Sequence, residues 1–496
     1  MASNAAVRDL LKKPLWKAAS LGQPLPDDPH AVAVSLPTWD SVIGYEEGRE
    51  KVMKSLETGY PRFFVHTMVK RLFAKATDEV ADVGKRAVVF PTKDAAQRAQ
   101  RYVERRINGA ARITSYGDSM QALIVPEEAI GVAMEYWRHT GEIVSSRQAD
   151  DFLNDREFEG GSSVMLRQQL AEHTGAALDD HFIFESGMSA IFAAHRAVTN
   201  HFPSKKTLQL EFPYVDALKV QEKLGNGVVF LYETEGEDFD EAVRRIQEGE
   251  FAAVFCEVPS NPLLRTVNLP RVSEACRQGG VPLVVDDTVA TCLNVDVLKY
   301  ADLVTTSLTK WVNGRGDVIA GMVTVNEDSS FATEFRSFLK EASDGGSLLY
   351  KGDCEKLIAN MKDFPERVRK SNENGELIAD YLSEHPAVGR VWYPKLVTPH
   401  EYQSVRRNEG GYGGLVTFTL KQPRKMPRVY DALELCKGPS LGTDFTLASP
   451  YTMLAHYFEM DWAEACGVSP NLLRLSVGIE DGDGILGALA RALDLG

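Results

Sequence analysis

Two strand-like runs in the second half of the chain each end at a side chain that could take part in chemistry. The apolar run 281–285 ends in Asp286, and the run 302–306 leads into Ser307 and Lys310. Ligands of open α/β sheets bind at the carboxyl ends of the strands, so the carboxylate and the amine are predicted to share one edge. A lysine amine can form an imine with a carbonyl compound, and a carboxylate can keep a ring nitrogen protonated. The same two residues are also typical of a surface lysine and a helix cap.

A third segment has the composition of an anion-binding turn. Ser186, Gly187 and Met188 follow an apolar run and precede a stretch of helix-forming residues. The N–H groups at a helix N-terminus bind phosphate, and a glycine lets the anion approach the backbone. Ser307 and Thr309, at alternate positions, could offer hydroxyl donors to the same phosphate. An ordinary serine N-cap is the alternative explanation.

Two more polar side chains belong to predicted strand ends or strands. Asn261 could donate to a ring hydroxyl oxygen or belong to an Asn-Pro turn. In the run 471–478, alternation places Arg474 on the face opposite the leucines, where an arginine needs a carboxylate partner from a substrate or from the protein. With Asp286 and Lys310, these groups match the two ends of pyridoxal 5′-phosphate (PLP) and an amino-acid substrate.

The elements that must position these residues alternate between strand and helix. Residues 149–328 are predicted to form a mostly parallel α/β sheet covered by helices, and residues 329–496 a smaller C-terminal α/β domain. The predicted strands are 182–184, 207–210, 228–232, 252–256, 282–286, 303–306, 321–325, 415–420 and 472–477. Residues 1–148 contain helical stretches at 9–18, 97–106 and 127–137 and are expected to supply subunit contacts and an active-site wall.

Composition limits the partners of the chain. A formal charge of −15 over 496 residues argues against nucleic acid and against an anionic membrane surface. The six cysteines stand singly, without the spacing of metal ligands, so neither a metal site nor a disulfide scaffold is expected. No apolar leader and no run long enough to span a bilayer is present, which favours a cytoplasmic protein.

The order of these motifs resembles that of the PLP-dependent enzymes of cysteine and methionine metabolism, the cystathionine γ-synthase and γ-lyase family. The resemblance is strongest to the fungal cystathionine γ-synthase-like branch and runs from about Thr38 onward. It includes the strings GYPRFF, VSSR, ESGMSAI, EFPYVDALK, EVPSNPLL, VVDDTVAT, SLTKWVNG, GPSLGTDFTLASPY and LLRLSVGIED. It implies the PLP-dependent transferase fold type I, which is aspartate-aminotransferase-like, with PLP as the cofactor.

The resemblance also implies roles for single residues. It identifies Lys310 as the Schiff-base lysine, Asp286 as the partner of the pyridine nitrogen and Tyr214 as the ring that stacks on the cofactor; these three are the expected catalytic residues. Asn261 would contact the 3′-oxygen of the cofactor. The implied phosphate cup consists of Ser186, Gly187, Met188, Ser307 and Thr309.

Four further residues are expected to complete the site. The resemblance implies that Arg147 reaches the phosphate of a neighbouring subunit, and that Arg474 with the backbone at Ser440 clamps the substrate carboxylate. A homodimer would then be the minimal active unit, and the family suggests a homotetramer. Ser145 stands where most of the wider family has tyrosine, which predicts a roomier substrate site.

The activity implied is γ-replacement on an O-acylated L-homoserine, acetyl or succinyl, through a vinylglycine ketimine. The nucleophile would be the thiol of cysteine, or a small carbon nucleophile in secondary metabolism. Elimination to 2-oxobutanoate by a γ-lyase uses the same residues and remains an alternative. A non-catalytic relative of the fold is the third possibility, against which the retention of Lys310, Asp286 and Arg474 argues.

Overall fold

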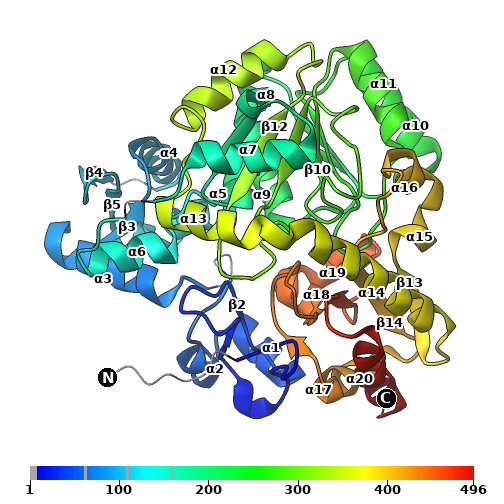
Figure 1. The fold of residues 1–496 in the computed structure, drawn as a ribbon. Coiled ribbons are helices and arrows are strands. Elements are labelled where there is room, and N and C mark those ends of the chain that lie inside the picture. The colour runs from blue at the N-terminus through cyan, green and yellow to red at the C-terminus, as the bar shows by residue number, and fades with distance from the viewer. Residues whose placement is uncertain (1–7, 61–63, 108–110, 159, 496) are drawn as a thin grey trace.

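A seven-stranded sheet forms the centre of the molecule (Figure 1). The computed structural model describes residues 8–60, 64–107, 111–158 and 160–495. Five neighbouring strands of the sheet are parallel, and β12 runs antiparallel to both of its neighbours. The predicted mostly parallel α/β sheet is therefore confirmed. In spatial order the strands are β6 (His181–Phe184), β12 (Gly321–Val325), β11 (Leu303–Thr306), β10 (Leu283–Asp286), β9 (Val254–Glu257), β7 (Thr207–Leu210) and β8 (Val228–Leu231).

Alternate strand residues pack against helices on opposite faces of this sheet. On one face Ala253, Phe255 and Val284 pack with the alanines of α8 and with Phe335 of α12. On the other face lies a second core with α10 and α11, to which the intervening residues of the same strands contribute. Burial on both faces explains why these strands are continuous apolar runs. The helices are α7 (Ser163–Thr174), α8 (Gly187–His201), α9 (Val215–Leu224), α10 (Gly236–Gln247), α11 (Leu269–Gly279), α12 (Ala332–Ala342) and α13 (Lys351–Asn360).

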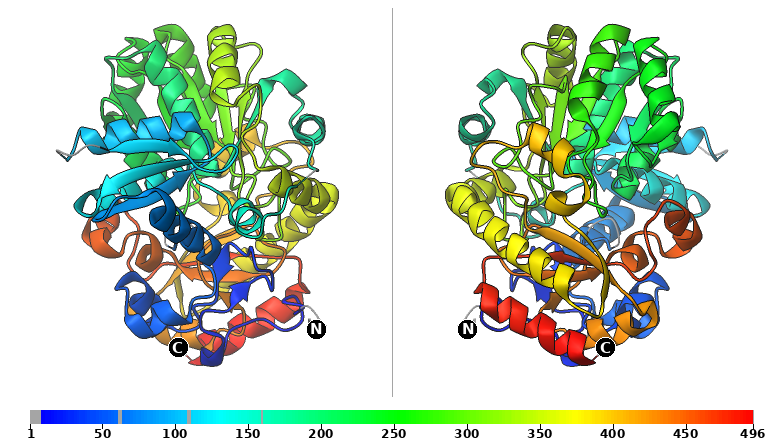
Figure 2. Two further views of the ribbon diagram at one scale, coloured as in Figure 1. Left: turned by 90° about the vertical axis from the view of Figure 1, so that its left-hand side faces the viewer. Right: turned by 90° about the vertical axis from the view of Figure 1, so that its right-hand side faces the viewer.

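A five-stranded sheet forms a second, smaller layer at the other end of the molecule (Figure 2). Its order is β13 (Val388–Trp392), β14 (Leu415–Leu420), β17 (Leu473–Ser476), β16 (Leu447–Pro450) and β15 (Cys436–Lys437), and only β15 and β16 are parallel. The accompanying helices are α14 (Phe364–Glu384), α15 (Pro394–Val397), α16 (Pro399–Val405), α17 (Met426–Ala432), α18 (Tyr451–Ala455), α19 (Met460–Ala465) and α20 (Gly482–Leu495).

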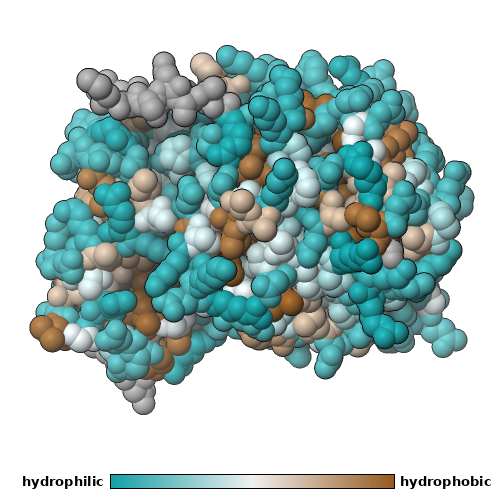
Figure 3. All heavy atoms as spheres, turned by 90° about the horizontal axis from the view of Figure 1, so that it is seen from below, coloured by the Kyte–Doolittle hydropathy of each residue, from teal (hydrophilic) through white to brown (hydrophobic). Residues whose placement is uncertain are grey.

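The first part of the chain completes the core of this small sheet. Leu36, Val42 and Leu56 are buried together with side chains of α14, α17 and α20. Helix α1 (Trp39–Glu46) therefore lies beside α17, and α2 (Glu50–Ser55) lies beside α1 (Figure 1). Seen from below, this end of the molecule is mostly hydrophilic, with apolar side chains in small separate groups (Figure 3). A short hairpin of β1 (Pro24–Leu25) and β2 (Ala33–Val34) precedes α1.

The described residues between Thr67 and Leu153 form a separate unit around a three-stranded sheet, and this unit has its own core. The strands β3 (Lys85–Phe90), β5 (Gln121–Pro126) and β4 (Arg112–Ser115) are antiparallel. They pack with α3 (Thr67–Val80), α4 (Lys93–Glu104) and α5 (Ile130–Thr140), and α6 (Ser146–Leu153) follows. Phe192 of α8 and Val220 of α9 join this core, so the unit is attached to the large sheet.

One predicted element is wrong. A helix was expected over residues 9–18, but the described residues form turns followed by a short 3-10 helix at Ala18–Ser20. Pro14 lies in the middle of the stretch and cannot donate a helical hydrogen bond. Leu10 and Leu15 pack instead against the hairpin and Cys436.

Candidate active site

A cavity of about 820 Å³ opens where the large sheet meets the small one. This volume includes space that is open to solvent. Its lining includes Lys310 and Asp286 from the large sheet and Arg474 from β17. The wall is mostly apolar, with Met188, Ile191, Val289, Leu441, Leu454 and Ala455 around these charged groups. The structure thus brings the strand-end residues of both sheets to one space.

Lys310 follows β11 and is buried in the cavity, with 8% of its surface exposed. Its Nζ donates to the Ser440 hydroxyl at 3.1 Å. Burial, and then the charge of Arg474, lower the pKa of Lys310 to about 7. An amine of this pKa is partly neutral near pH 7, so it can act as a nucleophile and as a base.

Asp286 ends β10, and the sheet register places Glu257 of β9 directly beside it. The carboxylate of Asp286 accepts from the backbone N–H of Thr288 at 2.8 Å and from the Thr305 hydroxyl at 3.1 Å. Burial raises the pKa of Asp286. Burial, and then the charge of Asp286, raise the pKa of Glu257 to about 8.

The carboxyl pair is suited to a cationic ring nitrogen. Within the described part of the chain, no lysine, arginine or histidine forms an ion pair with Asp286 or Glu257. A buried carboxylate without a cation is costly, and a protonated pyridine nitrogen would offset that cost. Glu257 also accepts from the backbone N–H groups of Tyr214 at 2.5 Å and Asn261 at 3.0 Å, so it fixes two other residues of the predicted site.

The N-terminus of α8 forms a narrow cradle opposite β11. The Ser186 hydroxyl accepts from the Ser189 N–H at 3.0 Å and donates to the Gly141 carbonyl at 2.8 Å, so it serves as the helix cap. A Cβ at Gly187 would lie 2.7 Å from the Oγ of Ser307. Only a residue without a side chain leaves room there, and first-turn N–H groups have no acceptor within the helix. The cradle therefore fits a phosphate group.

The other predicted hydroxyl, that of Thr309, is already engaged. It donates to the Ala320 carbonyl at 3.2 Å and accepts from the Ala320 N–H at 3.0 Å. Thr309 lines a smaller hollow that adjoins the cavity, together with Ser186 and Gly187. Thr309 thus lies beside the N-terminus of α8, and its hydroxyl binds the backbone of Ala320.

Arg474 lines the same cavity and is held by two acceptors. It donates to the Asn261 side-chain oxygen at 3.0 Å and to the Ser440 carbonyl at 2.7 Å. Its Nε has no partner among the described residues although it is buried. Burial lowers the pKa of Arg474 to about 10, which leaves the side chain charged. Ser440 has a φ of +96°, a strained conformation for a residue with a side chain, and such strain is found at functional sites.

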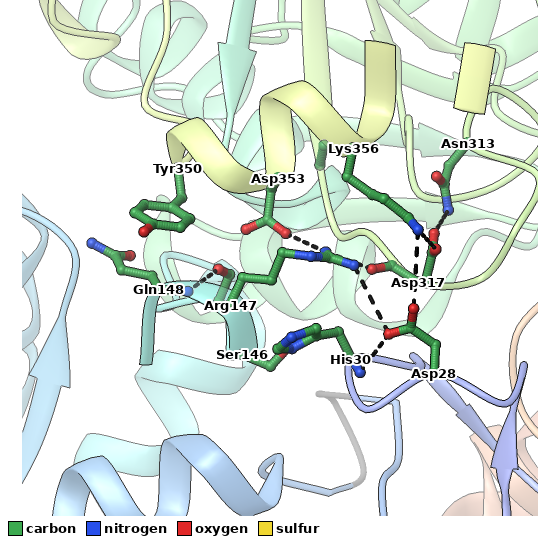
Figure 4. Close-up of polar contacts among 12 residues, drawn as sticks. Asp28, His30, Ser146, Arg147, Gln148, Asn313, Asp317, Tyr350, Asp353 and Lys356 are labelled. Atoms are coloured by element: carbon green, nitrogen blue, oxygen red, sulfur yellow. Dashed lines mark hydrogen bonds and ion pairs between the residues drawn. The ribbon is translucent and has the colours of Figure 1, made fainter. Parts of the chain in front are cut away.

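Ser145 and Arg147 do not line this cavity, and Figure 4 shows Arg147 beside Asp353 and Asp317. The Ser145 hydroxyl caps α6 by accepting from the Gln148 N–H at 3.1 Å. Arg147 donates to the Asp353 carboxylate at 2.6 Å and to the Asp317 carbonyl at 2.7 Å. Within one chain the two residues therefore make structural contacts, and a contact of Arg147 with a neighbour's phosphate stays a prediction.

Sequence reasoning gave no role to several residues of the cavity. The sequence could have indicated Glu257, because Glu257 ends a strand that lies beside the strand of Asp286. Both strands end at the same edge of the sheet. Thr288 accepts from the Ser307 N–H at 2.8 Å and ties the two strand ends together. Tyr60 and Tyr451 carry no periodic signal, because each reaches the cavity from outside the large sheet.

The sheet topology, the buried lysine facing the cavity, the carboxyl pair and the phosphate cradle define a PLP-dependent enzyme of the α/β type. The sequence matches the family model described as "Cys/Met metabolism PLP-dependent enzyme" over residues 139–494. The chain belongs to this family, which confirms the predicted cofactor. Residues 68–145 match the model "Fungal trans-sulfuration enzyme, N-terminal domain", and this range includes the three-stranded unit.

Individual relatives are similar over nearly the whole chain. Cystathionine gamma-synthase of Neurospora crassa is 31% identical, with 95% of this chain and 98% of the relative covered. L-2-amino-4-chloropent-4-enoate dechlorinase/desaturase of Streptantibioticus cattleyicolor is 32% identical, with the same coverage of 95% and 98%. The likeness to the fungal enzyme confirms the predicted resemblance to the fungal cystathionine γ-synthase-like branch.

The fold is also that of solved structures. Cystathionine gamma synthase from Xanthomonas oryzae pv. oryzae, in complex with aminoacrylate and cysteine, has a TM-score of 0.59 and 27% identity, with 67% of this chain and 86% of that chain covered. This likeness confirms the predicted PLP-dependent transferase fold type I. Among the described residues, no helix has the length and apolar character needed to cross a membrane.

Proposed function

We propose that the chain catalyses γ-replacement on an O-acylated L-homoserine. The observation that carries the proposal is that Lys310, Arg474 and Asp286 line one cavity. Arg474 would bind the α-carboxylate of the substrate through its planar guanidinium, and Asp286 would hold the ring nitrogen of the cofactor protonated. The resting amine of Lys310 is then beside the Cα and Cβ atoms.

PLP supplies, when bound, an electron sink for the charge that develops at Cα. Lys310 would move the protons: its Nζ would take the proton of Cα, give it up to the cofactor and, neutral again, take a proton from Cβ. The acyl group leaves Cγ as a carboxylate, and a nucleophile that has lost its own proton forms the new bond to Cγ. Lys310 returns protons to Cβ and Cα, so that one carboxylic acid is released for each nucleophile added.

The proposed nucleophile is the thiol of cysteine or a small carbon nucleophile. The similarity to cystathionine gamma-synthases supports the thiol. The apolar wall made by Leu441, Leu454 and Ala455 suits the methylene groups of the four-carbon chain and tolerates a carbon nucleophile equally. The leaving group is proposed to be acetate or succinate.

Elimination without a nucleophile is a second candidate, supported by the similarity to a dechlorinase/desaturase. It would use the same Lys310 and would release 2-oxobutanoate and ammonia from an O-acylhomoserine. Elimination differs from replacement because Cγ gains a proton in place of the nucleophile, and water then releases the amino group as ammonia.

The test is product analysis by mass spectrometry. Purified protein with PLP is incubated with O-acetyl- or O-succinyl-L-homoserine, alone, with cysteine, or with an acetoacetate-type compound. We expect a product that joins the four-carbon unit to one nucleophile, and no such product from Lys310→Ala. Keto acid without any added nucleophile would favour elimination, and equal products from both proteins would refute the proposal.

A further inference from the structure

Tyr60 brings an aromatic ring from the N-terminal part of the chain into the cavity of Lys310. It lies between α2 and α3, outside any helix or strand. The chain near it is anchored, because Leu56 and Phe64 are buried in the core of the small sheet. The Thr58 hydroxyl also donates to the carbonyl of Ala31. Contacts within the same chain therefore fix the backbone position of Tyr60.

The face of this ring meets the amine of Lys310. The Nζ atom lies 4.2 Å from the centroid of the Tyr60 ring, well within the distance at which an ammonium group is attracted to an aromatic face. The Ser440 hydroxyl holds the same nitrogen at 3.1 Å. Both contacts favour the charged amine and oppose burial and the charge of Arg474, which lower the pKa of Lys310.

Other charged and titratable groups line the cavity from every side. They are Arg474 of β17, Asp286 of β10, Glu257 of β9, Tyr214 before α9 and Tyr451 of α18. Of these, Arg474 is the group that lowers the pKa of Lys310 beyond the effect of burial. Tyr60 is distinguished from Tyr451, whose ring lies 5.1 Å from the Arg474 guanidinium carbon.

We propose that Tyr60 is a positioning residue for Lys310, supplied by the same chain. Its ring face holds the amine toward the middle of the cavity. The ring is also a wall shared with the adjoining hollow that contains Gly187 and Thr309, so it lies beside the phosphate cradle. The proposal rests on the proposed function in one respect: turnover depends on the position of this amine only if Lys310 carries the protons.

The first experiment measures Lys310 without turnover. Cofactor-free protein captures PLP through the neutral amine, so the rate of capture, followed by visible absorbance, rises with pH with a midpoint set by Lys310. Tyr60→Leu removes the ring face and should lower this midpoint by about one pH unit. Tyr60→Phe keeps the face and should stay within about 0.3 unit of the parent protein, since only the hydroxyl is lost.

Two controls make the result specific. Tyr232→Leu removes an exposed ring that does not line the cavity and should leave the midpoint unchanged. Tyr60→pentafluorophenylalanine keeps the shape of the ring but removes its negative face, so it should shift the midpoint as Tyr60→Leu does even if the leucine variant folds poorly. An unchanged midpoint in the pentafluorophenylalanine protein would overturn the proposal.

A second experiment tests whether Tyr60 acts within its own chain. Tyr60→Leu and Lys310→Ala proteins are co-expressed with different tags, and mixed oligomers are isolated. If Tyr60 serves its own chain, no active site of the mixed oligomer contains both Tyr60 and Lys310. The activity of the mixture should then not exceed the sum of the activities of the two variants. Recovery above that sum would show that the ring serves a neighbour and would contradict the proposal. If the proposed function is wrong, the parent protein forms no replacement product, yet the capture midpoints still differ.

Discussion

Burial of the Lys310 amine has a cost that can be measured in the cofactor-free protein. The folded-state pKa of about 7 lies below the ordinary value for lysine. Between these two values the unfolded chain binds more protons than the folded one. The free energy of unfolding therefore falls as pH drops toward 7, and the loss is complete below that pH.

Lys310→Met should remove this cost while filling nearly the same volume. In cofactor-free protein we expect the variant to be more stable than the parent by about 2–4 kcal/mol at pH 7, with the difference shrinking toward pH 9.5. Urea denaturation at the two pH values measures it. Exposed Lys340→Met is the matched control and should show no such pH-dependent gain. A constant difference at both pH values would argue against the lowered pKa.

Functional residues at strand ends could be predicted from the sequence, whereas functional residues in loops could not. Asp286 and Lys310 could be predicted to meet because parallel strands end at one edge, and the structure places both in one cavity. The polar contacts of Ser186 and Thr309 with Gly141 and Ala320 could not be predicted, since they depend on how distant loops pack. Tyr60 is the extreme case, because no periodicity links it to the large sheet.

At the scale of elements, the cradle at the N-terminus of α8 gives a prediction about the phosphate. Gly187→Ala would place a Cβ 2.7 Å from the Oγ of Ser307, so either the helix or the strand end must move. We expect the affinity for PLP to fall about 100-fold, an effect of overpacking at the anion site. Fluorescence titration of cofactor-free protein with PLP measures the dissociation constant.

The control uses a glycine in open space. A Cβ at Gly131, in the first turn of α5, would meet nothing within 4 Å. Gly131→Ala should leave the affinity for PLP unchanged and raise the free energy of unfolding by about 0.5–1 kcal/mol, since alanine is the better helix former. Equal PLP affinities in the two alanine variants would mean that the cradle does not hold the phosphate.

The pattern of elements was more predictable than their grouping. Apolar runs of four to five residues between helical stretches gave the strands of the large sheet, because burial on both faces requires them. The grouping of α1 and α2 with the small sheet could not be read from periodicity, since an amphipathic helix shows which face is buried but not against what. The helix predicted at 9–18 is absent because Pro14 interrupts the stretch.

At the scale of the whole molecule, Arg147 is predicted to bind the phosphate of a neighbouring subunit in addition to Asp353 of its own chain. Inside one chain it neutralises Asp353, whose carboxyl is buried with 1% of the residue exposed. Arg147→Met should therefore cost about 3 kcal/mol of stability, because a buried charge loses its partner. Thermal and urea denaturation measure this loss.

The double variant Arg147→Met/Asp353→Leu separates stability from phosphate binding. Replacing both charges should restore most of the stability, whereas the affinity for PLP should remain about tenfold lower if Arg147 contacts a neighbour's phosphate. Sedimentation analysis in the same buffers establishes whether the protein is an oligomer. Full recovery of PLP affinity in the double variant would limit Arg147 to its contact with Asp353.

The shared core of the small sheet also constrains how the protein is made. The Tyr430 hydroxyl donates to the Leu36 carbonyl across 394 residues of chain. At about 5–20 residues per second, roughly 20 to 80 s of synthesis separate the two partners. During that interval the apolar residues of α1 and α2 have been synthesised, but the small sheet against which they pack has not. The nascent chain therefore exposes apolar surface, of the kind that chaperones bind, in the segment that leads to Tyr60.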